Sequence, residues 1–372
     1  MIRSAHIFCR IVDNFGDIGI CWRLARQLAH ERHMQVCLWV DDLPTFRKLE
    51  PSLDINAATQ TLAGITIAQW HEPFSPPAQL PELVIETFSC RLPDSYIAAM
   101  KAAPQPPHWV NLDHLSAEPW VDGSHGLTSI HPASGLPRLF LFPGFTRASG
   151  GLLREQGLLA ARDAFQQDHG AQQSWWQQHI PAPWPAAGTL KVSLFAYSFA
   201  PYALLMDALH ATRCPVTLLV PQTITDAALV SSGQVKVIPY PLLAQDDFDR
   251  LLWSCDLNFV RGEDSWVRAI WAGRPFVWQA YAQPENAHEA KISAFLQRYG
   301  AEMPKSCAQT LELAHGLWNL SARADPHALT GLLSRLPEVA VASQQASQLL
   351  SASEASEDCV SRMLRLLNDR KI

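Results

Sequence analysis

The chain has 372 residues, of which 48% are hydrophobic and 17% charged, a composition typical of folded domains and long enough for two of them. Its formal net charge of −6 at pH 7 argues against a nucleic acid as the main partner, but it is compatible with a basic protein or a compact anionic ligand. No apolar run approaches ~18 residues and no signal-peptide pattern is seen, so we expect a cytoplasmic protein that does not enter a membrane.

The first half of the chain alternates apolar runs with helical patterns. Residues 19–31 place apolar side chains at helical spacing. Runs typical of buried strands occupy residues 6–12, 35–40, 82–88, 108–112 and 138–145. This alternation predicts parallel βαβ units and therefore a doubly wound α/β sheet.

A segment of different amino-acid composition separates the two halves. Residues 160–188 are rich in Gln, Pro and Gly and show no strand pattern. Strand patterns then resume at 190–197, 215–220, 235–240, 255–260 and 275–281, and residues 361–372 predict a closing amphipathic helix. We therefore predict a first Rossmann-like domain over 1–160, rejoined by a C-terminal helix near 350–372, then a linker over 161–188 and a second Rossmann-like domain over 189–349.

The stretch DNFGDIG, residues 13–19, directly follows the first predicted strand and opens the first helix. It should therefore lie at the carboxyl edge of the sheet, where doubly wound domains bind their ligands. Its glycines allow a tight turn or close approach to a ligand. One interpretation has Asp17 capping the helix while Asp13 and Asn14 form a turn. The alternative makes one aspartate a general base.

A second polar stretch, RGEDS at 261–265, has the same position between a strand and a helix. Free amides at the helix start, with Gly262, Arg261 and the Ser265 hydroxyl, would suit a phosphate. Glu263 and Asp264 oppose this on charge grounds, so we expect their side chains to turn toward sugar hydroxyls or backbone amides. A capping cluster without a ligand is the alternative interpretation.

Further candidates flank these stretches. Tyr197 ends a predicted strand, and Gln245 and Phe248 begin a helical pattern; Phe248 is also a candidate core residue. No GxGxxG follows the first strand, which disfavours a dinucleotide-dependent dehydrogenase. A two-lobed binding protein and a glycosyltransferase with two Rossmann-like domains stay open. The eight cysteines form no CxxC pair, so we expect reduced thiols and no metal site: Cys9, Cys21, Cys37, Cys90, Cys214, Cys255, Cys307 and Cys359.

Several motifs together resemble one known family. They are DNFGDIG with WRLARQL, NLDHLSAEPWV, FPGFT with GGLLRE, SLFAY, and RGEDSWVRA with GRPFVWQ, in order from the first strand to at least residue 285. These motifs are similar to those of the protein-arginine rhamnosyltransferases of bacterial translation elongation factor P, the EarP family. The stretch QPENAH, 283–288, departs from the Gln-Asp-Glu order more usual there, which puts the contribution of position 284 in question.

The resemblance implies a GT-B fold, with two facing Rossmann-like domains and an interdomain cleft. It implies an inverting transfer of L-rhamnose from dTDP-β-L-rhamnose to an arginine of elongation factor P, activating that factor. We further predict metal-independent catalysis, because Arg261 and the amides after Gly262 could stabilise the leaving diphosphate and no His/Cys/Asp cluster is seen in the sequence. No cofactor, nucleic acid or membrane is implied. The first domain would bind the protein acceptor, with Asp113, Glu118 and Trp120 as surface candidates beside the alternative of an ordinary solvated loop. The second domain would bind the nucleotide sugar.

The resemblance also implies residue roles. Asp17 would be the catalytic base, with Asp13 and Glu263 also required for activity. The nucleotide-sugar site would include Asn14, Phe15, Gly16, Gly19, Tyr197, Gln245, Phe248, Arg261, Gly262, Asp264 and Ser265. The same enzyme class with another acceptor or nucleotide sugar remains an alternative, as does a non-catalytic nucleotide-sugar-binding module.

Overall fold

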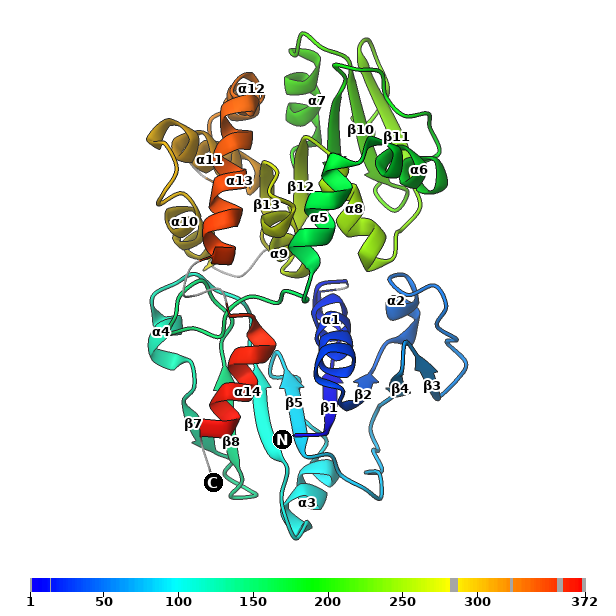
Figure 1. Cartoon of the computed structure of the whole chain (residues 1–372), viewed down its shortest axis with the longest axis vertical. Coiled ribbons are helices and arrows are strands. Elements are labelled where there is room, and N and C mark those ends of the chain that lie inside the picture. Colours follow the sequence, from blue (N-terminus) through cyan, green and yellow to red (C-terminus); the bar gives the residue numbers. More distant parts are fainter. Residues whose placement is uncertain (1, 14, 282–286, 322–323, 353–356, 370–372) are drawn as a thin grey trace. The chain divides into compact units, whose positions relative to one another are not determined.

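A computed structural model describes residues 2–13, 15–281, 287–321, 324–352 and 357–369 (Figure 1). The chain divides into two compact units. The N-terminal unit comprises Met1–Gln156 together with Glu354–Ile372, and the C-terminal unit comprises Gly157–Ser353. Each unit contains its own sheet.

The N-terminal unit is built on an eight-stranded sheet of order β3-β4-β2-β1-β5-β6-β8-β7. The inner strands run parallel, and the edge strands β3 and β7 pair antiparallel with their neighbours. Its strands are β1 (Ser4–Cys9), β2 (Gln35–Val40), β3 (Thr59–Leu62), β4 (Ile65–Gln69), β5 (Leu83–Thr87), β6 (His108–Leu112), β7 (Thr128–Ile130) and β8 (Pro137–Leu141). Parallel strands are covered by helices on both faces, which explains why β5 is buried at every position.

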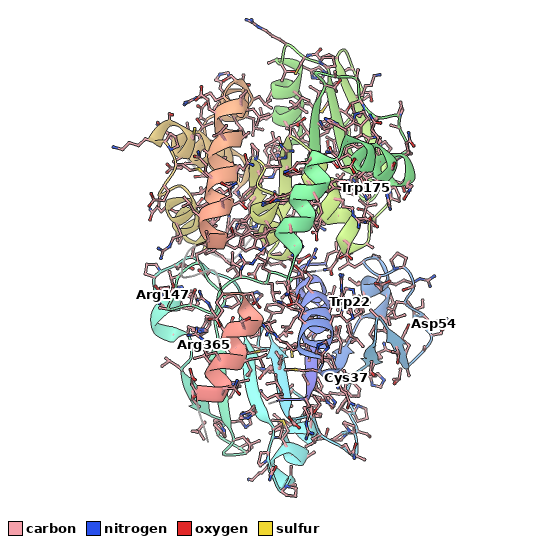
Figure 2. All side chains as sticks on the ribbon, viewed as in Figure 1. Trp22, Cys37, Asp54, Arg147, Trp175 and Arg365 are labelled. Atoms are coloured by element: carbon pink, nitrogen blue, oxygen red, sulfur yellow. The ribbon has the colours of Figure 1, made fainter. Side chains whose placement is uncertain are left out.

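The helices of this unit are α1 (Phe15–Arg32), α2 (Leu43–Arg47), α3 (Asp94–Ala102), α4 (Trp120–Ser124) and α14 (Cys359–Asp369). Although α14 is distant in sequence, its apolar face joins the core that α1 forms with the central strands (Figure 1). Val360 and Met363 of α14 are buried in the same core cluster as Trp22 of α1, which Figure 2 labels. The apolar positions of the C-terminal segment are thus explained by burial in the N-terminal unit.

The C-terminal unit is built on a five-stranded parallel sheet of order β11-β10-β9-β12-β13. Its strands are β9 (Leu190–Leu194), β10 (Val216–Pro221), β11 (Val235–Tyr240), β12 (Leu257–Arg261) and β13 (Phe276–Gln279). Its helices are α5 (Leu158–Gln167), α6 (His169–His179), α7 (Tyr202–His210), α8 (Gln245–Ser254), α9 (Asp264–Ala272), α10 (Ala287–Tyr299), α11 (Lys305–Trp318), α12 (Ala328–Ser334) and α13 (Leu336–Ala352). The chain order jumps between β9 and β12, so the carboxyl ends of these two neighbours form the topological switch point of the sheet.

The segment predicted as a linker, 161–188, is instead largely helical and belongs to the C-terminal unit. Asp168 ends α5 and caps α6, accepting a hydrogen bond from the Ala171 amide at 2.9 Å. Trp175 and Trp176 of α6 are buried in a core cluster (Figure 2), and the Trp175 indole donates to Asp247 at 3.0 Å. The prediction was wrong because the many glutamines among the apolar residues of α5 and α6 obscured the helical spacing of the buried positions in the sequence.

Candidate functional site

The loop before α1 is organised by the Asp17 side chain. Asp17 lies in the first turn of α1 and is only 5% exposed. Its Oδ2 accepts hydrogen bonds from the backbone amides of Val12, at 2.7 Å, and of Asp13, at 2.9 Å. Asp17 is therefore not an N-cap of the usual kind, because it bonds amides that precede the helix. Two amide donors stabilise the carboxylate and fix its position at the carboxyl edge of β1.

Asp13 and Gly16 are packed tightly against each other. The Gly16 amide donates to the Asp13 carbonyl at 2.7 Å, closing a turn. A Cβ at position 16 would lie 2.8 Å from Asp13 Oδ2, so only glycine leaves the carboxylate where it is. Phe15 begins α1 and Gly19 is buried within it, whereas Asn14 lies outside the described residues. The two carboxylates thus belong to one compact turn in the N-terminal unit.

A buried thiol lies behind this turn. Burial raises the pKa of the Cys9 thiol well above its usual range, and the neighbouring Cys21, Asp17 and Cys90 add to that shift. Burial likewise raises the pKa of Cys37 and Cys359 to about 12. A thiol in such surroundings stays protonated and behaves as a small core side chain. All eight cysteines are free.

In the C-terminal unit, the RGEDS turn joins β12 to α9. Gly262 has φ 63, a left-handed conformation that favours glycine, and Glu263 occupies the N-cap position of α9. Ser265 holds the turn closed, because its hydroxyl donates to the Arg261 carbonyl and accepts from the Arg261 amide at 3.2 Å. The turn therefore presents the amino terminus of α9 at the carboxyl edge of the sheet, as the strand–helix pattern predicts.

The two acidic side chains of this turn are each engaged by another residue. Glu263 Oε1 lies 2.7 Å from Lys291 Nζ on α10, and Asp264 Oδ2 accepts a hydrogen bond from Gln245 Nε2 at 3.4 Å. Each carboxylate thus has a side-chain partner, and its direction toward a sugar hydroxyl stays a prediction.

Aromatic rings surround Arg261. Its guanidinium carbon lies 4.7 Å from the ring centre of Phe195 and 4.6 Å from that of Tyr197, both cation–π distances. Phe248 of α8 meets Phe195 edge to face at 5.5 Å. The Tyr197 amide donates to the buried Gln279 side chain at 2.7 Å, which fixes the backbone after β9. These contacts hold a cation and flat apolar faces together at the switch point.

The structure therefore brings the predicted residues together in two sets. One set lies in the N-terminal unit: Asp13, Phe15, Gly16, Asp17 and Gly19. The other lies around β9, β12 and the starts of α8 and α9: Tyr197, Gln245, Phe248, Arg261, Gly262, Glu263, Asp264 and Ser265. Sequence reasoning missed Phe195 and Lys291. Phe195 belongs to the SLFAY motif and could have been found there, but no local signal marks Lys291.

The candidate acceptor residues make mostly local contacts. Asp113 accepts from the Asn111 side chain at 3.2 Å and from the His114 amide at 2.8 Å. Glu118 accepts from the Ser116 hydroxyl at 2.9 Å, and Trp120 is 46% exposed at the start of α4. Both carboxylates stabilise turns, which agrees with the interpretation of an ordinary loop, and Trp120 keeps an exposed apolar face.

Among the residues that the structure describes, neither a metal-binding group nor a membrane-crossing helix is found. No three His, Cys, Asp or Glu side chains among them are grouped so that they could hold a metal ion. Nor does any helix in that part of the chain have the length and apolar character needed to cross a membrane.

The fold defines a class. Over nearly its whole length the chain superimposes on GT-B glycosyltransferases, among them the calicheamicin glycosyltransferase CalG4 (TM-score 0.51, 14% identity, all of each chain). Another is the spinosyn rhamnosyltransferase SpnG complexed with thymidine diphosphate (TM-score 0.53, 13% identity, 99% of this chain and 100% of that one). The predicted fold class, a GT-B fold with two Rossmann-like domains, is confirmed.

The family is narrower than the fold. Residues 5–367 match the family model described as "Elongation-Factor P (EF-P) rhamnosyltransferase EarP", and the chain belongs to this family. A protein-arginine rhamnosyltransferase of Pseudomonas putida is 46% identical over 84% of this chain and 86% of that protein. One of Pseudomonas aeruginosa is 42% identical over 90% and 92%. A solved structure concerning EarP-mediated arginine glycosylation of translation elongation factor EF-P matches with TM-score 0.66 and 30% identity over 99% of both chains.

Proposed function

We propose that this protein transfers L-rhamnose from dTDP-β-L-rhamnose to an arginine side chain of translation elongation factor P, with inversion and without a metal ion. The transfer would activate the factor. The observation that carries the proposal is the family match over residues 5–367, which includes both the aspartate turn and the RGEDS turn. The relatives named protein-arginine rhamnosyltransferase support the same reaction.

The chemistry of the acceptor explains why carboxylates are needed. Making a neutral guanidine at pH 7 from a group of pKa ~13 costs about 8 kcal/mol, at ~1.36 kcal/mol per pKa unit. One aspartate of ordinary basicity cannot remove that proton in advance. In the proposed mechanism Asp17 and Asp13 grip the guanidinium through hydrogen bonds and accept its proton as the carbon–nitrogen bond forms. The amides of Val12 and Asp13 keep Asp17 oriented during that transfer.

The C-terminal unit supports the donor assignment. A diphosphate gains negative charge as it leaves, and it would be stabilised by the amino terminus of α9, by Arg261 and by the amides after Gly262. Gly262 has a left-handed φ of 63 and no side chain, so the backbone at this residue can approach the diphosphate closely. Phe248 would stack on the thymine base and Gln245 would hydrogen bond to its edge. Positive charge from the protein would replace the metal ion used by other transferases.

Intact-mass analysis tests the proposal directly. Purified elongation factor P is incubated with dTDP-rhamnose and this protein, beside an Asp17→Asn variant and a sample containing EDTA. We expect addition of one deoxyhexose, none with Asp17→Asn, and no effect of EDTA; NMR of the modified arginine should show an α linkage, as inversion from a β donor requires. If the folded protein binds the donor but modifies nothing, the assignment of the donor stands and elongation factor P is excluded as the acceptor. Loss of transfer in EDTA with recovery by a divalent ion would exclude the metal-free mechanism.

A further inference from the structure

The amino terminus of α9 has an unusual charge distribution for an anion site. Helix N-termini attract anions through their free amides and partial positive charge. Here the first residues are Glu263 and Asp264, two carboxylates that would repel a diphosphate. Gln245 is neutral, so its hydrogen bond to Asp264 does not offset either charge. Arg261 supplies one positive charge against these two carboxylates, so a second cation is needed nearby if the turn is to bind an anion.

Lys291 has the position required of that cation. It lies on α10, 28 residues after Glu263, and its Nζ stands 2.7 Å from Glu263 Oε1. The side chains are 15% and 13% exposed, so the ion pair is largely removed from water. A pair in such surroundings is screened by salt much less than an exposed one. The Lys291 ammonium group therefore offsets the negative charge of the Glu263 carboxylate and fixes the direction in which it points.

We propose that Lys291 is a positioning residue for the nucleotide-sugar site. It neutralises Glu263 and holds its carboxylate against α10, so that the amides of α9 and the Arg261 guanidinium can bind the diphosphate of the donor. This inference deepens the proposed function and rests on it. The diphosphate, and not the base or the sugar, is the part of the donor whose binding depends on Lys291.

Binding of thymidine diphosphate (TDP) and of thymidine, measured by calorimetry, separates this role from a structural one. Lys291→Met removes the cation that pairs with Glu263, and should weaken TDP binding roughly 10- to 100-fold while thymidine binding changes less than about 3-fold. Lys291→Arg keeps the charge and should stay within about 3-fold of the native protein for both ligands. The double variant Lys291→Met with Glu263→Gln removes both charges and should recover most of the TDP affinity.

A matched control is available in the same unit. Lys191 lies near the amino end of β9 and pairs with Asp256 at 3.3 Å, with side chains 18% and 36% exposed. Lys191→Met therefore removes a comparable partly buried ion pair at the opposite edge of the sheet from the proposed site. It should leave the affinities for TDP and thymidine unchanged.

Each outcome decides the matter. Equal losses for TDP and thymidine in Lys291→Met, accompanied by a lower melting temperature than in Lys191→Met, would reduce Lys291 to a structural residue. Unchanged TDP binding in Lys291→Met, or no recovery in the double variant, would overturn the charge argument while leaving the proposed function intact. If the native protein binds neither TDP nor thymidine, the donor assignment itself fails, and the role of Lys291 fails with it.

Discussion

Replacing Gly16 by alanine should separate activity from stability. A Cβ at this position would lie 2.8 Å from Asp13 Oδ2 and 3.4 Å from its Cγ. The first distance is too short for a real contact, so one of the two groups must move. The carboxylate stands at the end of a rotatable side chain, whereas the Gly16 backbone is held by helix α1. We therefore expect the Asp13 carboxylate to move and the backbone to stay.

The expected effect on stability is small because two contributions oppose each other. Alanine stabilises a helix by about 0.5–1 kcal/mol relative to glycine, and Gly16 has no positive φ that would forbid it. Forcing Asp13 away from its preferred rotamer costs about 0.5–1.5 kcal/mol. The free energy of unfolding should therefore change by less than about 1 kcal/mol, or roughly 2–4 °C in melting temperature. Catalysis is more sensitive, since a misplacement of about 1 Å can cost ~10²-fold in rate.

Rhamnosyl transfer at saturating donor and thermal melting would be measured on the same preparation. Gly331→Ala is the control, because Gly331 lies within α12 and an added Cβ would meet nothing within 4 Å. The control should gain helix stability and keep full activity. Full activity in Gly16→Ala would refute the link between Asp13 placement and catalysis. A fall of more than about 6 °C in melting temperature would show that the backbone yielded instead.

Three further predictions concern other residues. Asp17→Asn should lower kcat by roughly 10²- to 10⁴-fold in the mass assay. It should cost only about 2 kcal/mol in urea unfolding, because the side-chain amide oxygen can still accept hydrogen bonds from the backbone amides of Val12 and Asp13; near-native kcat would exclude Asp17 as the base. Asp249→Ala should destabilise the protein by about 3–5 kcal/mol in urea unfolding, because it removes a carboxylate that pairs with the buried Arg268 guanidinium, 2% exposed and 2.5 Å away. Adding Arg268→Met should restore part of the loss, and a cost below about 1 kcal/mol would contradict the reasoning. Burial lowers the pKa of His315 to about 4 from about 6.5 in the unfolded chain, so its contribution to stability is intact above pH 6.5 and decreases as the pH falls toward 4. The loss in the free energy of unfolding between pH 7.5 and 5 amounts to about 2 kcal/mol, measured by urea unfolding. His315→Gln should remove that part of the pH dependence, and an unchanged dependence of the unfolding free energy on pH would contradict this.

Much of the fold was predictable because parallel strands buried on both faces appear as continuous apolar runs. The runs that predicted β1, β2, β5 and β6 are apolar at more than half of their positions. Strands β3, β4 and β7 were missed; of these, the two edge strands β3 and β7 are largely polar, with no buried position in either. An edge strand pairs with a neighbour on one side only and is covered less than a central strand, so its own sequence contains few apolar residues.

The two candidate turns were also predictable, since each joins a buried strand to a helix and is marked by glycine and acidic residues. Local sequence determines that Gly262 adopts a left-handed backbone and that a helix starts directly after it. Local sequence likewise determines that Asp13 and Asp17 share one turn, because only three residues separate them.

Only the tertiary structure decided which partner each polar group takes. Glu263 pairs with Lys291 across 28 residues, Arg268 with Asp249 across 19, and Arg261 lies against the rings of Phe195 and Tyr197, which follow β9. Such pairs depend on how helices are placed over a sheet, which short-range periodicity does not encode. The sequence by itself therefore determined most of the central strands and the two strand–helix turns, and tertiary packing determined the edge strands and the partners of the charged groups within the site.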